Sequence, residues 1–316
     1  MSLIIRQFVL GKDEEIWVNI GNEAWKEFED YTPDTVHMFK KWEKSPWFTT
    51  EGMFIVELNG VPVGRVKAEI EKERTDNKGS LRGPYILPGF RRKGIGEALA
   101  RKAFESLKLR GMGKVEAWAT NKNPVGQIFL KKFGFIQVRV FSTMRRNLSD
   151  IPSGTGESET VDLILLGKTE DDVKLINQLD NEIFKEHFNH RPQTMEETRY
   201  YIQNSEENGF LLFIFLARIK DEPVGYLSFG IYPEDNKFLG RKRGVLQSLG
   251  VLKNFRGQGI AKKLMIKGME YLKAKGMEEA ELFVDDANPT ESFKLYEKLG
   301  FKVVKKHFTY LKTMTE

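Results

Sequence analysis

The sequence contains no cysteine, and this absence excludes several kinds of chemistry. Without cysteine there is no disulfide framework, no cysteine-based zinc site and no cysteine nucleophile. Long apolar runs are also missing, because the longest, Phe210–Ala217, is far below the roughly 20 residues that cross a bilayer. The N-terminal segment alternates like a strand and lacks the features of a signal peptide. We therefore expect a cytoplasmic protein without a membrane partner.

A concentrated basic tract is missing too. The chain has 50 Lys and Arg against 45 Asp and Glu, and the resulting net charge of +5 is dispersed along the sequence. A nucleic-acid surface would gather its basic residues, so we expect no nucleic-acid partner, although a local anion site remains compatible. With 40% hydrophobic and 30% charged residues, the composition is that of a globular protein and excludes general disorder.

One sequence pattern is present twice. At about 150 residues per domain, a chain of 316 residues predicts two domains. Residues 90–99 (FRRKGIGEAL) align with residues 255–264 (FRGQGIAKKL) at a separation of 165 residues. Two further pairs keep the order and nearly the same separation: Asn123-Pro124 with Asn288-Pro289, and Phe133-Gly134-Phe135 with Leu299-Gly300-Phe301. This agreement indicates an internal duplication.

The segment between the copies predicts a linker. Ile151–Glu159 is rich in Gly, Pro, Ser and Glu and has little apolar surface to bury. The expected organisation is an N-terminal domain at residues 1–148, a linker at 149–160 and a C-terminal domain at 161–316.

Both halves show the same succession of predicted elements, which indicates an α/β fold. An opening strand (Leu3–Val9 or Val161–Leu166) precedes helices, a hairpin, a strand, a helix, another strand, a short helix and a closing hairpin. The hairpin turns are expected near Asn59-Gly60 and Asp221. Apolar residues repeat at four-residue steps from Ile95 and from Ile260, and both helices should end at a glycine, Gly111 or Gly276.

In both copies a predicted strand runs into an Arg-x-x-Gly-x-Gly/Ala turn that opens a helix. The first N–H groups of a helix lack partners within it, and the helix dipole adds positive potential there, so such a turn suits a phosphate or pyrophosphate. Arg91 and Arg256 would add cations. A P-loop is excluded because no Gly-Lys-Ser/Thr is present, and Leu99 and Leu264 stand where a dinucleotide fingerprint needs its third glycine. A purely structural tight turn is the alternative.

Together these motifs resemble the GNAT superfamily of N-acetyltransferases, in the tandem arrangement of its mycothiol-synthase-like members. The resemblance is most specific in the second copy, and its segments are Leu249-Gly250-Val251, Arg256-Gly257-Gln258-Gly259-Ile260-Ala261 and Val284–Phe301. It implies two GNAT-like domains, each with a mixed, mostly antiparallel central sheet flanked by helices, a fold that some schemes class as α+β. It also implies an acetyl-CoA-dependent N-acyltransferase that moves an acetyl group to a primary amine by direct attack.

The resemblance assigns roles to individual residues of the second copy. The residue matching the family's catalytic tyrosine is Tyr296, which would protonate the departing CoA thiolate, and a phenol within hydrogen-bond reach is suited to that task. The resemblance implies acetyl-CoA contacts from Leu249, Gly250, Val251, Arg256, Gly257, Gln258, Gly259, Ile260, Ala261, Asn288 and Ser292. A non-catalytic CoA-binding regulatory protein is the alternative function.

The first copy departs from the pattern at the catalytic position. Leu130 stands where Tyr296 stands in the second copy, and leucine has no proton to donate. The first copy either holds CoA without turnover or serves as structural support, and its basic run Arg91-Arg92-Lys93 favours retained binding. The expected cofactor contacts there are Arg91, Arg92, Lys93, Gly94, Ile95 and Gly96.

The acceptor side is less defined in the sequence. Residues 181–194 resemble the family segment that borders the acceptor pocket, and they contain His187 and His190, which we interpret as solvated or capping rather than as metal ligands. A general base is required, and the candidates near the end of one strand stay open: Glu281, Asp285 and Asp286. Trp25, Trp42 and Trp47 either line a pocket or pack in a core. The acceptor would be a small-molecule or peptide amine, and the chain a monomer or homodimer.

Overall fold

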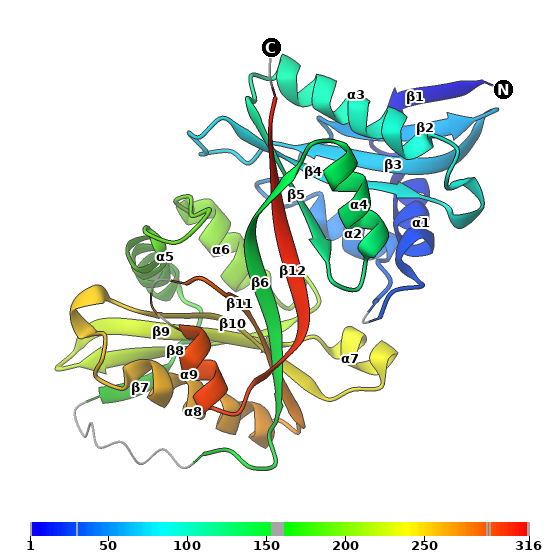
Figure 1. Ribbon diagram of the computed structural model, residues 1–316. Helices are drawn as coiled ribbons and strands as arrows, with labels where there is room; N and C mark the ends of the chain where they lie inside the picture. The colour runs from blue at the N-terminus through cyan, green and yellow to red at the C-terminus, as the bar shows by residue number, and fades with distance from the viewer. Residues whose placement is uncertain (1, 30, 153–160, 289, 291, 315–316) are drawn as a thin grey trace. The chain divides into compact units, whose positions relative to one another are not determined.

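The computed structural model describes residues 2–29, 31–152, 161–288, 290 and 292–314 (Figure 1). It divides into two compact units, Met1–Arg139 with His307–Glu316, and Val140–Lys306. Relative to a division at the linker, the first unit therefore gains the C-terminal end of the chain, and the second gains residues 140–148. Residues 153–160 of the predicted linker lie outside the described residues.

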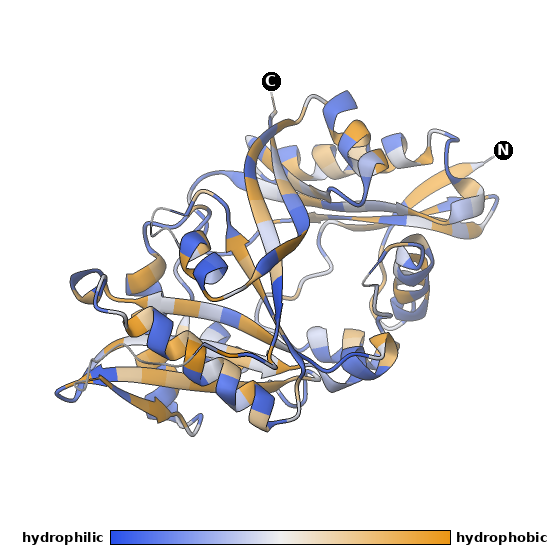
Figure 2. Ribbon diagram, turned by 60° about the horizontal axis from the view of Figure 1, so that its bottom comes forward, coloured by the Kyte–Doolittle hydropathy of each residue, from blue (hydrophilic) through white to orange (hydrophobic). Residues whose placement is uncertain are grey.

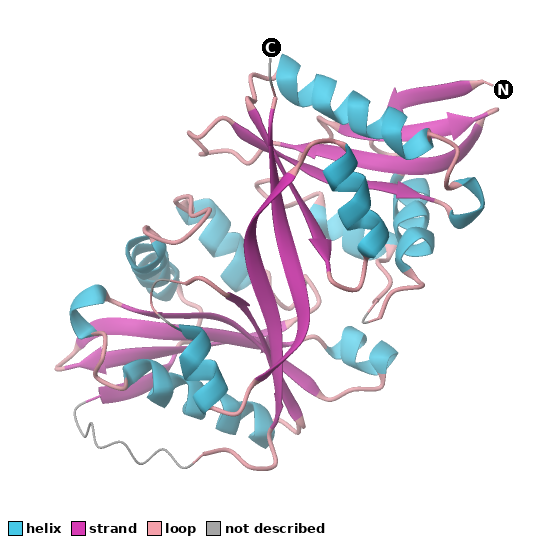
Figure 3. Cartoon of the chain, viewed as in Figure 1, coloured by secondary structure: helices cyan, strands magenta, loops and turns pink. Residues whose placement is uncertain are grey.

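The first unit is a mixed sheet with helices on both faces (Figure 3). Its strand order is β1-β2-β3-β4-β5-β12, in which β4 and β5 are parallel and the other neighbours antiparallel. Its elements are β1 (Leu3–Gln7), α1 (Glu14–Trp25), α2 (Val36–Trp42), β2 (Met53–Leu58), β3 (Val61–Glu69), β4 (Lys78–Ile86), the 3-10 turn η1 (Pro88–Phe90), α3 (Ile95–Leu109), β5 (Lys114–Thr120), α4 (Pro124–Lys132), the start of β6 (Ile136–Asn147) and the end of β12 (Lys302–Thr313).

The second unit repeats this plan. Its strand order is β6-β11-β10-β9-β8-β7, and again one pair, β10 with β11, is parallel. Its elements, besides the parts of β6 and β12, are β7 (Val161–Leu165), α5 (Glu170–Phe184), α6 (Met195–Gln203), β8 (Leu211–Ile219), β9 (Glu222–Ile231), α7 (Pro233–Leu239), β10 (Arg243–Val251), η2 (Lys253–Phe255), α8 (Ile260–Ala274), β11 (Glu279–Asp285) and α9 (Ser292–Lys298). The predicted α/β class, with tandem mixed sheets, is confirmed.

The turns between β2 and β3 and between β8 and β9 have the geometry that the sequence indicated. Asn59 and Gly60 both have positive φ, 51° and 79°, as a two-residue hairpin turn requires. Lys220 and Asp221 form the matching turn with φ of 48° and 65°. The predicted closing hairpins are wrong, because β6 and β12 are each one continuous strand of 12 residues. Neither strand contains a glycine or proline that would turn the chain back within it.

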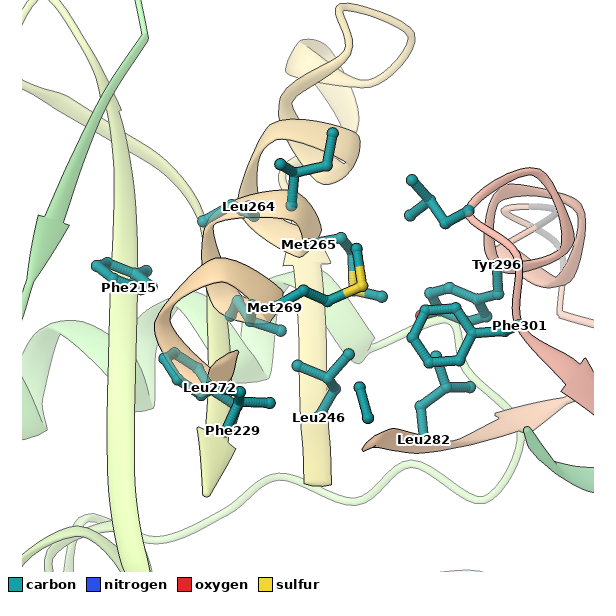
Figure 4. Close-up of a cluster of buried hydrophobic side chains, with 14 of the residues drawn as sticks. Phe215, Phe229, Leu246, Leu264, Met265, Met269, Leu272, Leu282, Tyr296 and Phe301 are labelled. Carbon is teal, nitrogen blue, oxygen red and sulfur yellow. The ribbon is translucent and has the colours of Figure 1, made fainter. Parts of the chain in front are cut away.

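Each sheet has an apolar core on both faces. In the second unit α8 and α9 cover one face and α5 with α6 the other, and β8 and β9 carry long apolar stretches (Figure 2). The four-residue stripe predicted on α8 is buried, with Leu264 and Leu272 fully inaccessible, and these side chains meet those of β9 and β10 (Figure 4). The matching stripe on α3 is buried in the first unit. No helix in the described ranges is both long and apolar enough to cross a membrane.

The close approach of β9 to β10 depends on Gly225. A Cβ added there would lie 2.5 Å from the backbone oxygen of Gly250, and a backbone atom cannot move aside as a side chain does. We expect Gly225→Ala to lower the free energy of unfolding by about 1–3 kcal/mol, measured by urea denaturation. The control is Gly167→Ala, where the nearest atom would be 3.8 Å away and little change is expected. Equal stability of the two variants would contradict this account of the strand contact.

Candidate active site

Strands β10 and β11 separate partway along their length. Their parallel pairing covers Arg243–Leu246 and Glu279–Leu282 and then stops. Their outer neighbours continue, since β9 pairs with β10 as far as Val251 and β6 pairs with β11 as far as Asp285. A β-bulge at Gln247 interrupts the β9–β10 register at this point. The inner edge of β10 beyond the bulge therefore pairs with no strand in the described part of the chain.

The turn that follows β10 leaves several backbone donors unused. Gly257 and Gly259 adopt positive φ, 79° and 78°, which lets the chain turn sharply into α8. The first helical N–H with an acceptor is that of Lys263, which donates to the Gly259 carbonyl at 3.0 Å. Among the described residues, no acceptor meets the N–H groups of the helix's first turn, Ile260, Ala261 and Lys262. This is the arrangement of an anion site at a helix N-terminus.

Arg256 stands beside these donors. Its Nε donates to the backbone oxygen of Val251 at 3.1 Å, which holds the guanidinium at the end of β10. No carboxylate of the described residues forms an ion pair with it. A guanidinium with unused donors next to unpaired amides provides charge-assisted hydrogen bonds for a phosphate group.

A cavity of about 750 Å³ lies in the second unit, and most of the predicted site residues line it. They come from β10, the glycine turn, α8 and the segment from β11 to α9: Leu249, Gly250, Val251, Arg256, Gly257, Gly259, Ile260, Ala261, Asn288, Ser292 and Tyr296. Gln258 belongs to the turn but is exposed and is not part of the lining. Lys262 and Lys298 join Arg256 as basic groups at the cavity. The individual roles of these residues stay predictions.

Tyr296 is held in α9 by apolar neighbours. Its side chain is 8% exposed, and its ring lies beside that of Phe301, with the centroids 6.2 Å apart (Figure 4). Burial raises the pKa of Tyr296 to about 12, against a smaller opposite effect of Ser292. The buried Ser292 hydroxyl lies near the phenol but forms no hydrogen bond of good geometry with any described residue. The phenol therefore remains protonated throughout the neutral range and is available as a donor.

The structure separates the three acidic candidates for the general base. Glu281 forms ion pairs with two arginines, with Oε2 2.6 Å from Arg145 and 3.1 Å from Arg243, and it does not belong to the cavity lining. Asp286 lies outside the cavity lining, and its Oδ2 is 3.7 Å from Lys306. Asp285 lines the cavity. Strand alternation alone did not say which of the three carboxylates faces the cavity, and of the three only Asp285 belongs to its lining.

Several cavity residues carry no signal in the sequence. The rings of Phe141 and Phe283 stack with centroids 5.2 Å apart and planes 4° from parallel, and both line the cavity. Gln247 and Ser248 line it as well. His187 also borders the cavity and is half-buried, and its interpretation as a solvated or capping residue stays a prediction. No set of three metal-binding side chains is grouped in the described ranges.

The first unit repeats the turn but not its surroundings. The caps Gly94 and Gly259 have φ of 77° and 78°, so the backbone shape is the same. Arg91, however, donates to Glu27 at 3.0 Å and to the Ala24 carbonyl at 3.1 Å. Leu130, which stands at the position of Tyr296, is 4% exposed. None of the six residues predicted as cofactor contacts here belongs to the cavity of the second unit: Arg91, Arg92, Lys93, Gly94, Ile95 and Gly96.

Two of the three tryptophans considered for a pocket, Trp25 and Trp42, pack against aromatic neighbours. Trp42 lies in an apolar cluster with Phe39 and Phe48, at ring centroid distances of 5.3 and 4.8 Å. Trp25 contacts Tyr85 at 5.9 Å. Core packing is thus the arrangement observed for Trp42.

Comparison with known proteins identifies relatives of both units. The acetyltransferase (GNAT) family profile matches residues 17–135 and 174–301. A mycothiol acetyltransferase of Salinispora arenicola is 31% identical over 229 residues, 71% of this chain and 70% of that protein. One from Acidothermus cellulolyticus is 27% identical over 228 residues, 69% of this chain and 66% of that protein, so the match spans about two thirds of that relative.

Solved structures share the fold of the whole chain. A tandem GNAT protein from the clavulanic acid biosynthesis pathway superposes with a TM-score of 0.78 at 14% identity, covering 100% of this chain and 99% of that one. A GCN5-related N-acetyltransferase from Sphaerobacter thermophilus gives a TM-score of 0.70 at 19% identity, covering 98% and 95%. At these identities the likeness concerns the fold.

The state of the Tyr296 phenol is directly measurable. Because burial disfavours the phenolate, we expect its ring carbon resonance to stay in the protonated position up to about pH 10. Carbon NMR of tyrosine-labelled protein, assigned by the signal lost in Tyr296→Phe, measures this. A midpoint near the ordinary tyrosine value of about 10 would contradict the buried environment.

Proposed function

This chain belongs to the acetyltransferase (GNAT) family, and from that premise we propose that it transfers an acetyl group from acetyl-CoA to a primary amine by direct attack, with the chemistry in the second unit. The observation that carries the proposal is one cavity bordered both by unused N–H groups at the start of α8 and by the Tyr296 phenol. The N–H groups suit a diphosphate, and the phenol suits a departing thiolate.

The residues at the cavity fit acetyl-CoA, which supplies an activated thioester when bound. The amides of Ile260, Ala261 and Lys262 and the Arg256 guanidinium would hold the diphosphate. The unpaired inner edge of β10 at Leu249–Val251 would accept the amide-containing arm as an additional strand. Asn288 and Ser292 would contact the cofactor from the opposite wall.

Tyr296 would act as the general acid. When the amine nitrogen forms its bond to the acetyl carbon and the carbon–sulfur bond breaks, the sulfur leaves as a thiolate that needs a proton. The phenol, protonated at neutral pH by virtue of its burial, donates it. Arg256 and the helix dipole stabilise negative charge on the cofactor side of the same cavity.

The acceptor is proposed as an amine of a small molecule or a peptide. Two of the relatives are named mycothiol acetyltransferases, and the match covers 66% and 70% of their length. The stacked rings of Phe141 and Phe283 line the cavity, where they would border the acceptor. We therefore propose an acceptor that presents an apolar or aromatic surface next to its amine.

Replacement of the phenol tests the mechanism. We expect Tyr296→Phe to lower kcat by about 10²–10⁴-fold with little change in the KM for acetyl-CoA, because general acid catalysis is lost and cofactor contacts remain. CoA release in the presence of a panel of primary amines measures both constants. The control is Tyr271→Phe, which removes a hydroxyl from the apolar core and should leave kcat unchanged. An active Tyr296→Phe enzyme would remove this residue from the mechanism.

A further inference from the structure

The cavity contains few groups that can accept a proton. Among the residues that the structure describes, its titratable lining comprises His187, Arg256, Lys262, Asp285, Tyr296 and Lys298. Lysine and arginine side chains are hydrogen-bond donors without an acceptor, and burial raises the pKa of Tyr296 to about 12, so that its phenol keeps its proton. The candidates for a base in direct contact with an acceptor are therefore His187 and Asp285.

His187 is positioned without using its ring nitrogens. It follows the end of α5, where its backbone N–H donates to the Phe184 carbonyl at 2.8 Å. Its imidazole meets the Phe184 ring edge to face, with centroids 4.7 Å apart and planes at 87°. Within the described ranges no side chain or carbonyl forms a hydrogen bond with the imidazole. Packing thus orients the ring and leaves its nitrogens to the cavity.

The electrostatic surroundings keep the imidazole neutral at physiological pH. Burial lowers the pKa of His187, and Arg256 and His190 act in the same direction. Asp285 on β11 and the neighbouring Glu186 oppose them, although Glu186 is also paired with Lys253 at 3.2 Å. A neutral imidazole has a lone pair to offer, and the carboxylate across from it would stabilise the imidazolium that forms.

Asp285 is less suited to the transfer itself. Its Oδ1 accepts the N–H of Ala287 at 3.1 Å, so the carboxylate caps the turn after β11. An imidazole is also the stronger base of the two side-chain types. The charge of Asp285 suits a cationic acceptor entering the cavity.

We propose that His187 is the general base that removes the proton from the acceptor amine, an inference that rests on the proposed function. As the nitrogen–carbon bond forms and the carbon–sulfur bond breaks, the proton on nitrogen passes to the imidazole and the proton of Tyr296 passes to sulfur. His187 then returns its proton to solvent, and the Tyr296 phenolate takes one up, so the products are an amide and a free thiol. Asp285 is a positioning residue that stabilises the imidazolium.

The test compares two histidines that lie three residues apart. His187→Gln keeps a polar side chain of similar reach without its basicity, and we expect kcat to fall by about 10²-fold. The wild-type profile of kcat/KM for the amine should rise with pH as His187 loses its proton, and this acidic limb should vanish in the variant. His190→Gln, at a residue outside the cavity lining, should keep the rate and retain the limb, with its midpoint raised because His190 lowers the pKa of His187.

A second readout does not depend on turnover. Histidine ring protons followed by NMR in the free protein should show His187 titrating below the ordinary value of about 6.5. Addition of CoA should raise that midpoint, because the diphosphate would offset the charge of Arg256.

The outcomes separate the two proposals. Wild-type turnover combined with an unchanged rate and pH profile in His187→Gln would overturn the role of His187 and leave the transferase intact. A CoA-insensitive His187 midpoint would also count against its place at the site. A wild type that binds CoA but acetylates no amine would contradict the proposed function itself, and the base with it.

Discussion

The separation of β10 from β11 is the constraint on which the site depends. Backbone donors and acceptors inside a protein must be paired, and a sheet normally pairs them with the next strand. Within the described residues, the inner edge of β10 has no such partner beyond the bulge at Gln247, and the first turn of α8 leaves further amides unused beside it. These groups share a cavity with Tyr296, so a ligand that satisfies them is brought to a proton donor.

The duplication shows which parts of this arrangement belong to the scaffold. Both units place a glycine cap of the same conformation before a helix that packs on the sheet. Around the first cap, Arg91 is occupied by α1, and Pro84 lies at the strand position that Leu249 holds in the second unit. Proline has no N–H to offer a ligand, and Leu130 has no proton to donate. The two units thus share the backbone conformation of the glycine cap but differ in the chemical groups around it.

Much of the fold was predictable because it depends on short-range patterns. The repeat, the αL glycines, the two-residue turns and the stripe on α8 are all local consequences of residue type. The sequence wrongly predicted a closing hairpin in each half. The residues of β6 and β12 are compatible with either a hairpin or one long strand. The choice between the two depends on pairing with strands distant in sequence, β11 for β6 and β5 for β12.

Only the site residues that belong to a recognisable sequence motif could be predicted. The glycine turn and Tyr296 are recognisable in sequence, and the structure brings them to one cavity. The bulge at Gln247, the Phe141–Phe283 stack and the exposure of His187 to the cavity depend on strand register and packing. The two arginines that occupy Glu281 come from β6 and β10, so its exclusion as a base required tertiary contacts.

The central claim is that Arg256 and the adjoining amides hold the diphosphate of acetyl-CoA. Isothermal titration calorimetry of acetyl-CoA with Arg256→Gln, paired with the equivalent Arg91→Gln, tests it most directly. Hydrogen bonds to a charged group contribute about 1.5–3 kcal/mol, so Arg256→Gln should weaken the affinity by about 10–100-fold. Arg91→Gln should leave that affinity unchanged. Wild-type affinity in Arg256→Gln, or an equal loss in both variants, would contradict the account.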